Sequence, residues 1–163
     1  MKRKFNSLFD VLEFTLQGVN ATEAMLINDV GLITDQLTSA ATRYEVDSYL
    51  GTLRDNQIGI ERVFTYLMKN DLTRTNAVMR EMIHETHGLL SQTNQASLKE
   101  ILMITSLQNI VAYKISMYRA AYQIALELEL ETPADILQQL LEKEMNAAKS
   151  FDRISLIQFT NVP

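Results

Sequence analysis

The feature that most constrains this chain is a set of four long segments in which apolar residues recur every three or four positions. An average spacing of about 3.5 residues places these side chains on one stripe of an α-helix, as in helices that pack side by side at shallow angles. Only five glycines and two prolines occur in 163 residues, so strong helix breakers are scarce. The pattern predicts an all-α four-helix bundle. The four stripes comprise Phe9, Leu12, Leu16, Val19, Leu26, Val30, Ile33 and Leu37; Val46, Leu50, Leu53, Ile60, Phe64 and Leu67; Ile101, Ile104, Val111, Ile115, Tyr118, Tyr122 and Ala125; and Leu137, Leu140, Ala147, Phe151 and Ile154.

Helix starts are marked by a Ser or Thr followed three residues later by an acid, the capping-box pattern. The four pairs are Ser7 with Asp10, Thr42 with Glu45, Ser97 with Glu100, and Thr132 with Asp135. We expect one domain over residues 1–163. Its helices are predicted over residues 7–38, 42–69, 97–129 and 132–157, with an additional short helix over 75–91 in the connection between the second and third long helices.

Composition excludes several classes of protein. Fifteen basic and twenty acidic residues give a net charge of −5, without the basic stripe that nucleic-acid binding requires. Because the chain has no cysteine, disulfides, thiolate metal sites and cysteine nucleophiles are excluded. No run of about 18 apolar residues is present to span a membrane. We therefore expect a soluble, cytoplasmic protein that binds neither nucleic acid nor membranes.

Each apolar stripe has one polar interruption near its middle. The four residues are Glu23, Gln57, Gln108 and Glu144. Helices of similar length would bring them to a similar height, where they would form one polar layer. These residues either set the register of the helices or are partly exposed at a helix edge. The alternative is that they are the remnant of a di-metal carboxylate site of the kind that four-helix bundles hold.

Two other groups of residues have conceivable functional roles. His84 and His87 lie three residues apart on the predicted short helix, where they are a weak candidate for binding a metal ion at the surface. The alternative is an exposed polar face. Tyr113, Tyr118 and Tyr122 resemble a radical or redox ladder. The alternative, which we expect, is that Tyr118 and Tyr122 are core residues at stripe positions, with hydroxyls that reach water.

Several segments resemble the YciE/YciF family of bacterial ferritin-like proteins. They are residues 7–12, Glu23 with Ala24, residues 50–64, residues 108–118 and residues 140–148, so the resemblance extends over nearly the whole chain. It implies a ferritin-like bundle that is associated with stress responses and is commonly dimeric. It also implies a family in which two metal ions lie between the helices.

The family's metal ligands are carried over only in part. Glu23 matches the glutamate of the first helix, and Glu144 matches a carboxylate of the fourth. In the second helix Asp47 matches the acidic position, but the histidine position is Leu50. A di-iron centre needs about six protein ligands, so the resemblance implies a degenerate site.

The third helix departs furthest from the family pattern. Where the family reads Glu-His-Tyr-Glu, residues 111–114 read Val-Ala-Tyr-Lys, and the last acidic position of the fourth helix is Ala148. We hypothesise that the Lys114 ammonium replaces the missing cations and contacts Glu23 or Glu144, with Gln57 and Gln108 supplying hydrogen bonds. The alternative is that Lys114 extends outward into solvent.

These observations lead to an expected function. We expect a non-catalytic, stress-associated protein without a cofactor, which acts by self-association as a homodimer or through an unknown protein partner. The alternative is a di-iron carboxylate metalloprotein, oxidase-like or peroxidase-like, with two iron or manganese ions in a rearranged site. A carrier of lipids or small apolar ligands is a third class, supported only by the apolar stripes.

Overall fold

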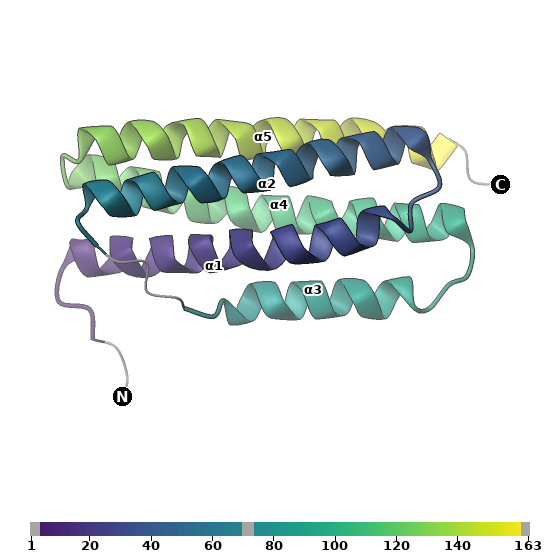
Figure 1. The fold of residues 1–163 in the computed structure, drawn as a ribbon, viewed down its shortest axis with the longest axis horizontal. Helices are drawn as coiled ribbons and strands as arrows, with labels where there is room; N and C mark the ends of the chain where they lie inside the picture. Colours follow the sequence, from purple (N-terminus) through teal and green to yellow (C-terminus); the bar gives the residue numbers. More distant parts are fainter. Residues whose placement is uncertain (1–3, 70–73, 161–163) are drawn as a thin grey trace.

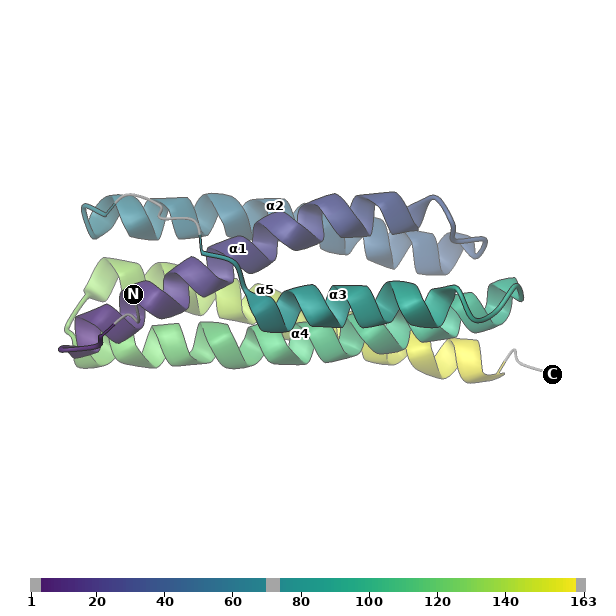
Figure 2. The same ribbon diagram turned by 90° about the horizontal axis from the view of Figure 1, so that it is seen from below.

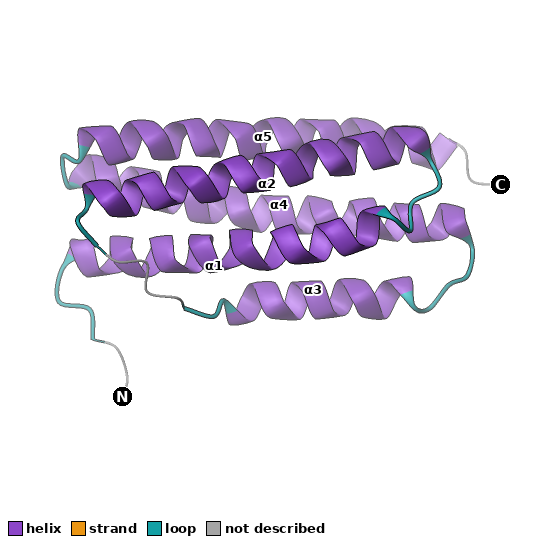
Figure 3. Cartoon of the chain, in the orientation of Figure 1, coloured by secondary structure: helices purple, strands orange, loops and turns teal. Residues whose placement is uncertain are grey.

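A computed structural model describes residues 4–69 and 74–160, and within these residues the chain forms five helices and no strand (Figure 3). The helices are α1 (Leu8–Thr34), α2 (Ala40–Tyr66), α3 (Ala77–Leu90), α4 (Ala96–Glu127) and α5 (Glu131–Thr160). With 14 residues, α3 is about half as long as each of the others. The predicted all-α class is confirmed.

The four longer helices lie side by side as two antiparallel hairpins, α1 with α2 and α4 with α5 (Figures 1 and 2). The connection from α2 to α4 returns along the length of the molecule and contains α3, so α2 and α4 run in the same direction (Figure 1). The helix α3 packs mainly along α4 and also touches α1. This arrangement brings one face of each of the four long helices to a common interior.

The helix starts agree with the predicted caps at one of four places. Ser7 forms a complete capping box with Asp10, in which each side chain bonds the other residue's backbone N–H. The prediction for Thr42 is wrong, because α2 begins at Ala40 and its cap is Ser39, whose hydroxyl accepts from the Thr42 N–H. The fifth helix begins at Glu131, one residue before Thr132.

The predicted box of Ser97 and Glu100 is also wrong. The helix α4 begins at Ala96, and its cap residue Gln95 makes no side-chain cap hydrogen bond. Glu100 instead reaches across to the start of α2, where its carboxylate accepts hydrogen bonds from the Thr38 and Ser39 N–H groups at 2.7 Å each. The acid therefore stabilises the positive end of a different helix.

Three of the long helices end earlier than the sequence pattern predicts. The last residues are Thr34 rather than 38, Tyr66 rather than 69, and Glu127 rather than 129, whereas α5 continues beyond 157 to Thr160. Just after α2 and α4, Met68 and Glu129 adopt positive φ angles of 51° and 55°. Glycine normally occupies this left-handed position, and its absence here removes the usual stop signal from the sequence.

The apolar interior consists of two clusters. One lies toward the end of α1 and the start of α2, and includes Leu26, Val46 and Phe151. The other lies toward the opposite end, and includes Leu16, Ile60 and Leu137. Glu23, Lys114 and Glu144 belong to neither apolar cluster, although they are at most 1% exposed. A buried polar layer therefore separates the two halves of the core.

Two of the predicted stripes are correct only in part, because at some positions the preceding residue is buried instead. On α2 Tyr49 and Asn56 are buried at such positions, whereas the predicted Leu50 and Gln57 are only half-buried. On α4 the residues buried at such positions are Leu107 and Lys114, in place of Gln108 and Ile115. This difference decides which polar side chains enter the interior.

Candidate functional site: a buried lysine between two carboxylates

Lys114 of α4 is the central residue of the polar layer. Its Nζ atom lies 2.6 Å from Glu144 Oε1 on α5 and 3.0 Å from Glu23 Oε2 on α1. It also donates to the hydroxyl oxygen of Tyr49 on α2, at 3.1 Å. An ammonium group has three N–H donors and no acceptor, so these three contacts use its full hydrogen-bonding capacity.

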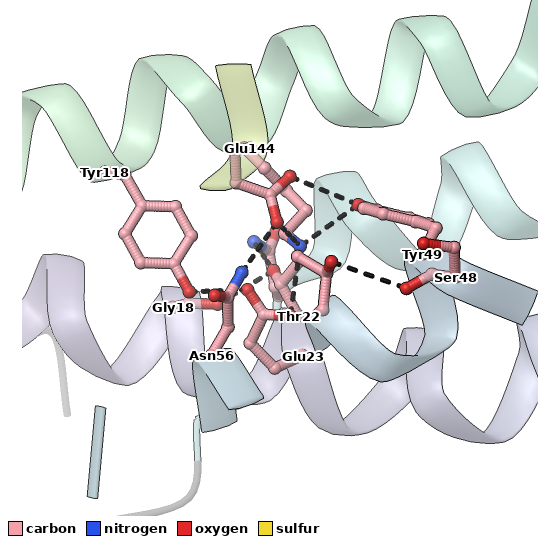
Figure 4. Close-up of polar contacts among 11 residues, drawn as sticks. Gly18, Thr22, Glu23, Ser48, Tyr49, Asn56, Tyr118 and Glu144 are labelled. Carbon is pink, nitrogen blue, oxygen red and sulfur yellow. Dashed lines mark hydrogen bonds and ion pairs between the residues drawn. The ribbon is translucent and has the colours of Figure 1, made fainter. Parts of the chain in front are cut away.

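The two carboxylates are held by further donors from the surrounding helices (Figure 4). Tyr118 donates to Glu23 Oε1 at 2.6 Å. The Asn56 side-chain amide donates to Glu144 Oε1 at 2.7 Å, and the Tyr49 hydroxyl donates to Glu144 Oε2 at 3.2 Å. Every carboxylate oxygen therefore accepts at least one hydrogen bond, as buried charged groups require.

The charges in the layer do not balance when both acids are ionised. The pKa of the Glu23 carboxyl is raised from 4.5 to about 7, mainly by burial. The positive charge of Lys114 and the hydrogen bond from Tyr118 lower this pKa, whereas the negative charge of Glu144 raises it further. Burial and the nearby carboxylates also hold the pKa values of Tyr49 and Tyr118 well above their usual range, so both hydroxyls keep their protons as donors. The layer can thus take up one proton near neutral pH.

The structure brings together three of the five residues expected in the layer. Lys114 contacts both Glu23 and Glu144, as the charge-replacement hypothesis predicts. The expected hydrogen bonds from the two glutamines are wrong. Gln57 is only half-buried, and Gln108 donates outward to Asp152 at 2.8 Å.

Sequence reasoning missed Tyr49 and Asn56 and misjudged Tyr118. The Tyr118 hydroxyl does not reach water; its side chain is fully buried and bonds Glu23. A usable signal was present for the other two: Tyr49 and Asn56 lie three and ten residues after Val46, on the same helical face. The apolar Leu50 beside Tyr49 favoured the predicted stripe.

The two histidines lie away from this layer. Both are exposed on α3, and His87 Nε2 pairs with Asp29 of α1. Across residues 4–69 and 74–160, no three His, Asp or Glu side chains are grouped so that they could hold a metal ion. Metal binding by His84 and His87 stays a prediction.

The residues present in the layer do not fit the two metal ions that the family resemblance implies. The Lys114 ammonium lies between Glu23 and Glu144, where a cation would otherwise bridge them. The histidine position of the second helix is Leu50, an apolar side chain without a ligand atom. The chemistry of this donor set is that of an internal ion pair, and no metal-dependent step follows from it.

The fold and the layer define a class: an all-helical bundle with a buried ion-pair network at its centre. The chain belongs to the family described as "Domain of unknown function (DUF892)", whose model matches residues 10–158. No curated protein matches the sequence. None of the described helices is long and apolar enough to cross a membrane.

Two solved structures are similar to this chain. The E. coli stress protein YciF superposes with a TM-score of 0.92 at 15% identity, over 97% of this chain and 100% of YciF. YcfI of Rhodopseudomonas palustris superposes with a TM-score of 0.90 at 16% identity, over 93% and 97% of the two chains. Together with the family match, this confirms the resemblance to the YciE/YciF family.

Proposed function

We propose that this chain is a non-catalytic, ferritin-like protein with a stress-associated role in the cytoplasm, in which a lysine ammonium takes the place of metal ions. The observation that carries the proposal is the position of Lys114 between Glu23 and Glu144, at 3.0 and 2.6 Å. A metal-dependent oxidase would need this space for its ions. The stress association is taken from the name of the structurally similar YciF.

The proposed mode of action is self-association or binding of a protein partner. Several apolar side chains remain exposed on the described surface, among them Leu32, Leu156 and Phe159. Exposed large apolar residues gathered into a patch are a common mark of a protein interface. The network at the centre then has a structural task, since it fixes how the four helices pair.

Metal analysis tests the proposal. Protein purified without an affinity tag should contain less than about 0.1 iron, manganese or zinc ion per chain, because the ammonium repels a second cation. Added Fe²⁺ or Mn²⁺ should leave the melting temperature unchanged, since a ligand that binds the native state would raise it. A stoichiometric metal whose loss follows substitution of Glu23 or Glu144 would overturn the proposal in favour of a rearranged di-metal site.

A matched variant makes this test sharper. Lys114→Ala removes the ammonium and leaves both carboxylates in place. If the ammonium is what keeps cations out, the variant should be stabilised by Mn²⁺ or Zn²⁺, whereas the unaltered protein is not. Equal responses of the two proteins would contradict the idea that Lys114 substitutes for a metal.

A further inference from the structure

A groove of about 260 Å³ lies between α2 and α5, next to the buried network. Ion pairs between these helices involve residues along its length: Glu45 with Arg153 at 2.6 Å, and Asp55 with Lys143 at 3.0 Å. The α2 residues of these pairs are ten positions apart, about 15 Å along a helix. The groove is thus a short depression between the two helices, and these charged contacts lie beside it.

Uncharged hydrogen-bonding groups line the groove between these pairs. They come from Ser48, Thr52, Asn146 and Ser150. The Thr52 hydroxyl makes one long hydrogen bond, 3.4 Å to the Ser48 carbonyl. Among the described residues, the side chains of Ser48, Asn146 and Ser150 have no protein hydrogen-bond partner, so their donors and acceptors are available to a ligand.

The apolar part of the lining consists of Tyr49, Phe151 and Ala147. The two rings meet edge to face, with centroids 5.2 Å apart, and both are at most 2% exposed. The Tyr49 hydroxyl is engaged inside the bundle by Lys114 and Glu144. The groove therefore combines a small apolar base with hydroxyl and amide groups on its walls.

Charge narrows the class of ligand. Both carboxylates of the lining are paired with a cation from α5, so the groove has no uncompensated charge for a charged ligand to neutralise. We propose that this groove binds a small neutral polyhydroxylated compound, of the size of a monosaccharide or a cyclic polyol. Its hydroxyls would bond Ser48, Asn146 and Ser150, and its C–H face would lie against Ala147. The volume lies just under the roughly 300–1,000 Å³ of drug-sized sites, which suits a single ring.

The test is a titration followed by two-dimensional amide NMR with D-glucose and with myo-inositol. A ligand of about twelve non-hydrogen atoms in an open groove should bind with a dissociation constant in the millimolar range. We expect saturable shifts at the amides of Ser48, Thr52 and Asn146 for at least one compound. D-glucuronate and D-glucosamine, which carry charge, should bind less tightly.

Three variants locate the site. Ala147→Leu fills the groove and should weaken binding about tenfold or more, and Asn146→Ala should weaken it severalfold. Ala120→Leu, the same exchange at an exposed position of α4, is the matched control and should leave binding unchanged. Since Asn146 is exposed, its variant should fold even if Ala147→Leu does not. No saturable shift with either compound, unchanged binding in Asn146→Ala, or tighter binding of the charged compounds would overturn the proposal.

Discussion

At the scale of single residues, Lys114 decides the chemistry of the bundle centre. Two buried carboxylates without a cation would repel each other and lose their hydration, a cost of several kcal/mol per ion. The lysine stem runs from α4 into the interior and brings one positive charge to both acids. The one ammonium thereby joins the two acids in a buried ion pair.

Removing that charge should be severely destabilising. Lys114→Met keeps most of the side-chain volume but leaves Glu23 and Glu144 unpaired, so we expect a loss of about 3–5 kcal/mol, the range for breaking a buried ion pair. Urea denaturation at pH 8 measures the change. Lys143→Met is the control, because Lys143 also pairs with an acid but is 43% exposed, and it should cost no more than about 1 kcal/mol. Similar losses for the two variants would contradict the buried-pair interpretation.

The raised pKa of Glu23 gives the stability a defined dependence on pH. Between about 4.5 and 7 the folded protein holds a proton on Glu23 that the unfolded chain has released, so stability from this group falls as pH rises through that window. The full effect is on the order of 3 kcal/mol. Glu23→Gln stays uncharged at every pH, and the difference in unfolding free energy between it and the unaltered protein should grow in favour of the variant from pH 4.5 to 8. A difference that does not vary with pH would contradict the prediction.

Glu100 gives the stability the opposite dependence on pH, and it does so in a lower pH range. Burial acts to raise its pKa, but hydrogen bonds from Ser39, Thr38 and Thr42 outweigh burial and lower it below the ordinary value. A lowered pKa gives stability that is present above the unfolded value and is lost as pH falls through the folded one. The two acids together favour greatest stability at mildly acidic pH.

At the scale of helices, the sequence specifies which segments are helical better than which residue of each turn is buried. In a 3.5-residue pattern, steps of three and of four both stay on one face. On α2 and α4 the pattern predicts that the apolar Leu50 and Ile115 face the core. In the structure the residues that precede them, Tyr49 and Lys114, are buried instead. The partners of a buried polar residue lie on other helices, so the local sequence assigns Tyr49 and Asn56 to a helical face but does not distinguish them from exposed polar residues.

Helix ends, too, can be predicted from the sequence only where the capping partner lies nearby in the chain. The Ser7 cap is local, since its partner Asp10 lies three residues away, and it was predictable. The carboxylate at the start of α2 comes from Glu100, which lies 61 residues from Ser39. Caps contributed from another helix depend on the tertiary fold and cannot be read from neighbouring residues.

The close approach of α2 and α5 depends on a residue without a side chain. A Cβ atom at Gly59 would lie 2.7 Å from Leu140 Cδ2 and 3.2 Å from its Cγ, closer than packed atoms allow. We expect Gly59→Ala to destabilise the protein by about 1–3 kcal/mol, as overpacked cores do, despite the better helix propensity of alanine. Thermal or urea denaturation measures it.

The matched control for this prediction lies on the same helix. Gly51 is exposed, and a Cβ atom there would meet nothing within 4 Å. Gly51→Ala should therefore show only the higher helix propensity of alanine over glycine, and it should stabilise the protein by roughly 0.5–1 kcal/mol. If both variants gained stability, Leu140 would have to move aside without cost, and the close packing of α2 on α5 would not be limiting.

At the scale of the whole molecule, the polar layer divides one bundle into two apolar halves. Each half alone would tolerate helices that slide or exchange partners, because apolar contacts are not directional. The network joins α1, α2, α4 and α5 through specific donors and acceptors, whose hydrogen bonds depend on the relative height of the helices. Buried polar groups are known to set register in helical assemblies at some expense of stability.

Self-association is the last expectation and concerns the outer surface. Leu156, Ile157 and Phe159 are 69%, 48% and 56% exposed in the final turns of α5, and Leu32 at the end of α1 is 71% exposed. Both helices end at the same end of the bundle (Figure 1). Exposed apolar side chains at one end of the bundle favour a second copy of the chain as their cover.

We therefore expect a homodimer in solution, measured by light scattering on a size-exclusion column. Leu156→Glu places a charge in the expected contact and should yield a monomer. The unfolding free energy of the variant chain should change by no more than about 0.5 kcal/mol. Met68→Glu is the control, because Met68 is 93% exposed but follows α2 at the opposite end of the bundle, and it should remain dimeric. A monomer at high micromolar concentration would rule out the dimer. A dimer that survives Leu156→Glu but not Met68→Glu would move the interface to the other end.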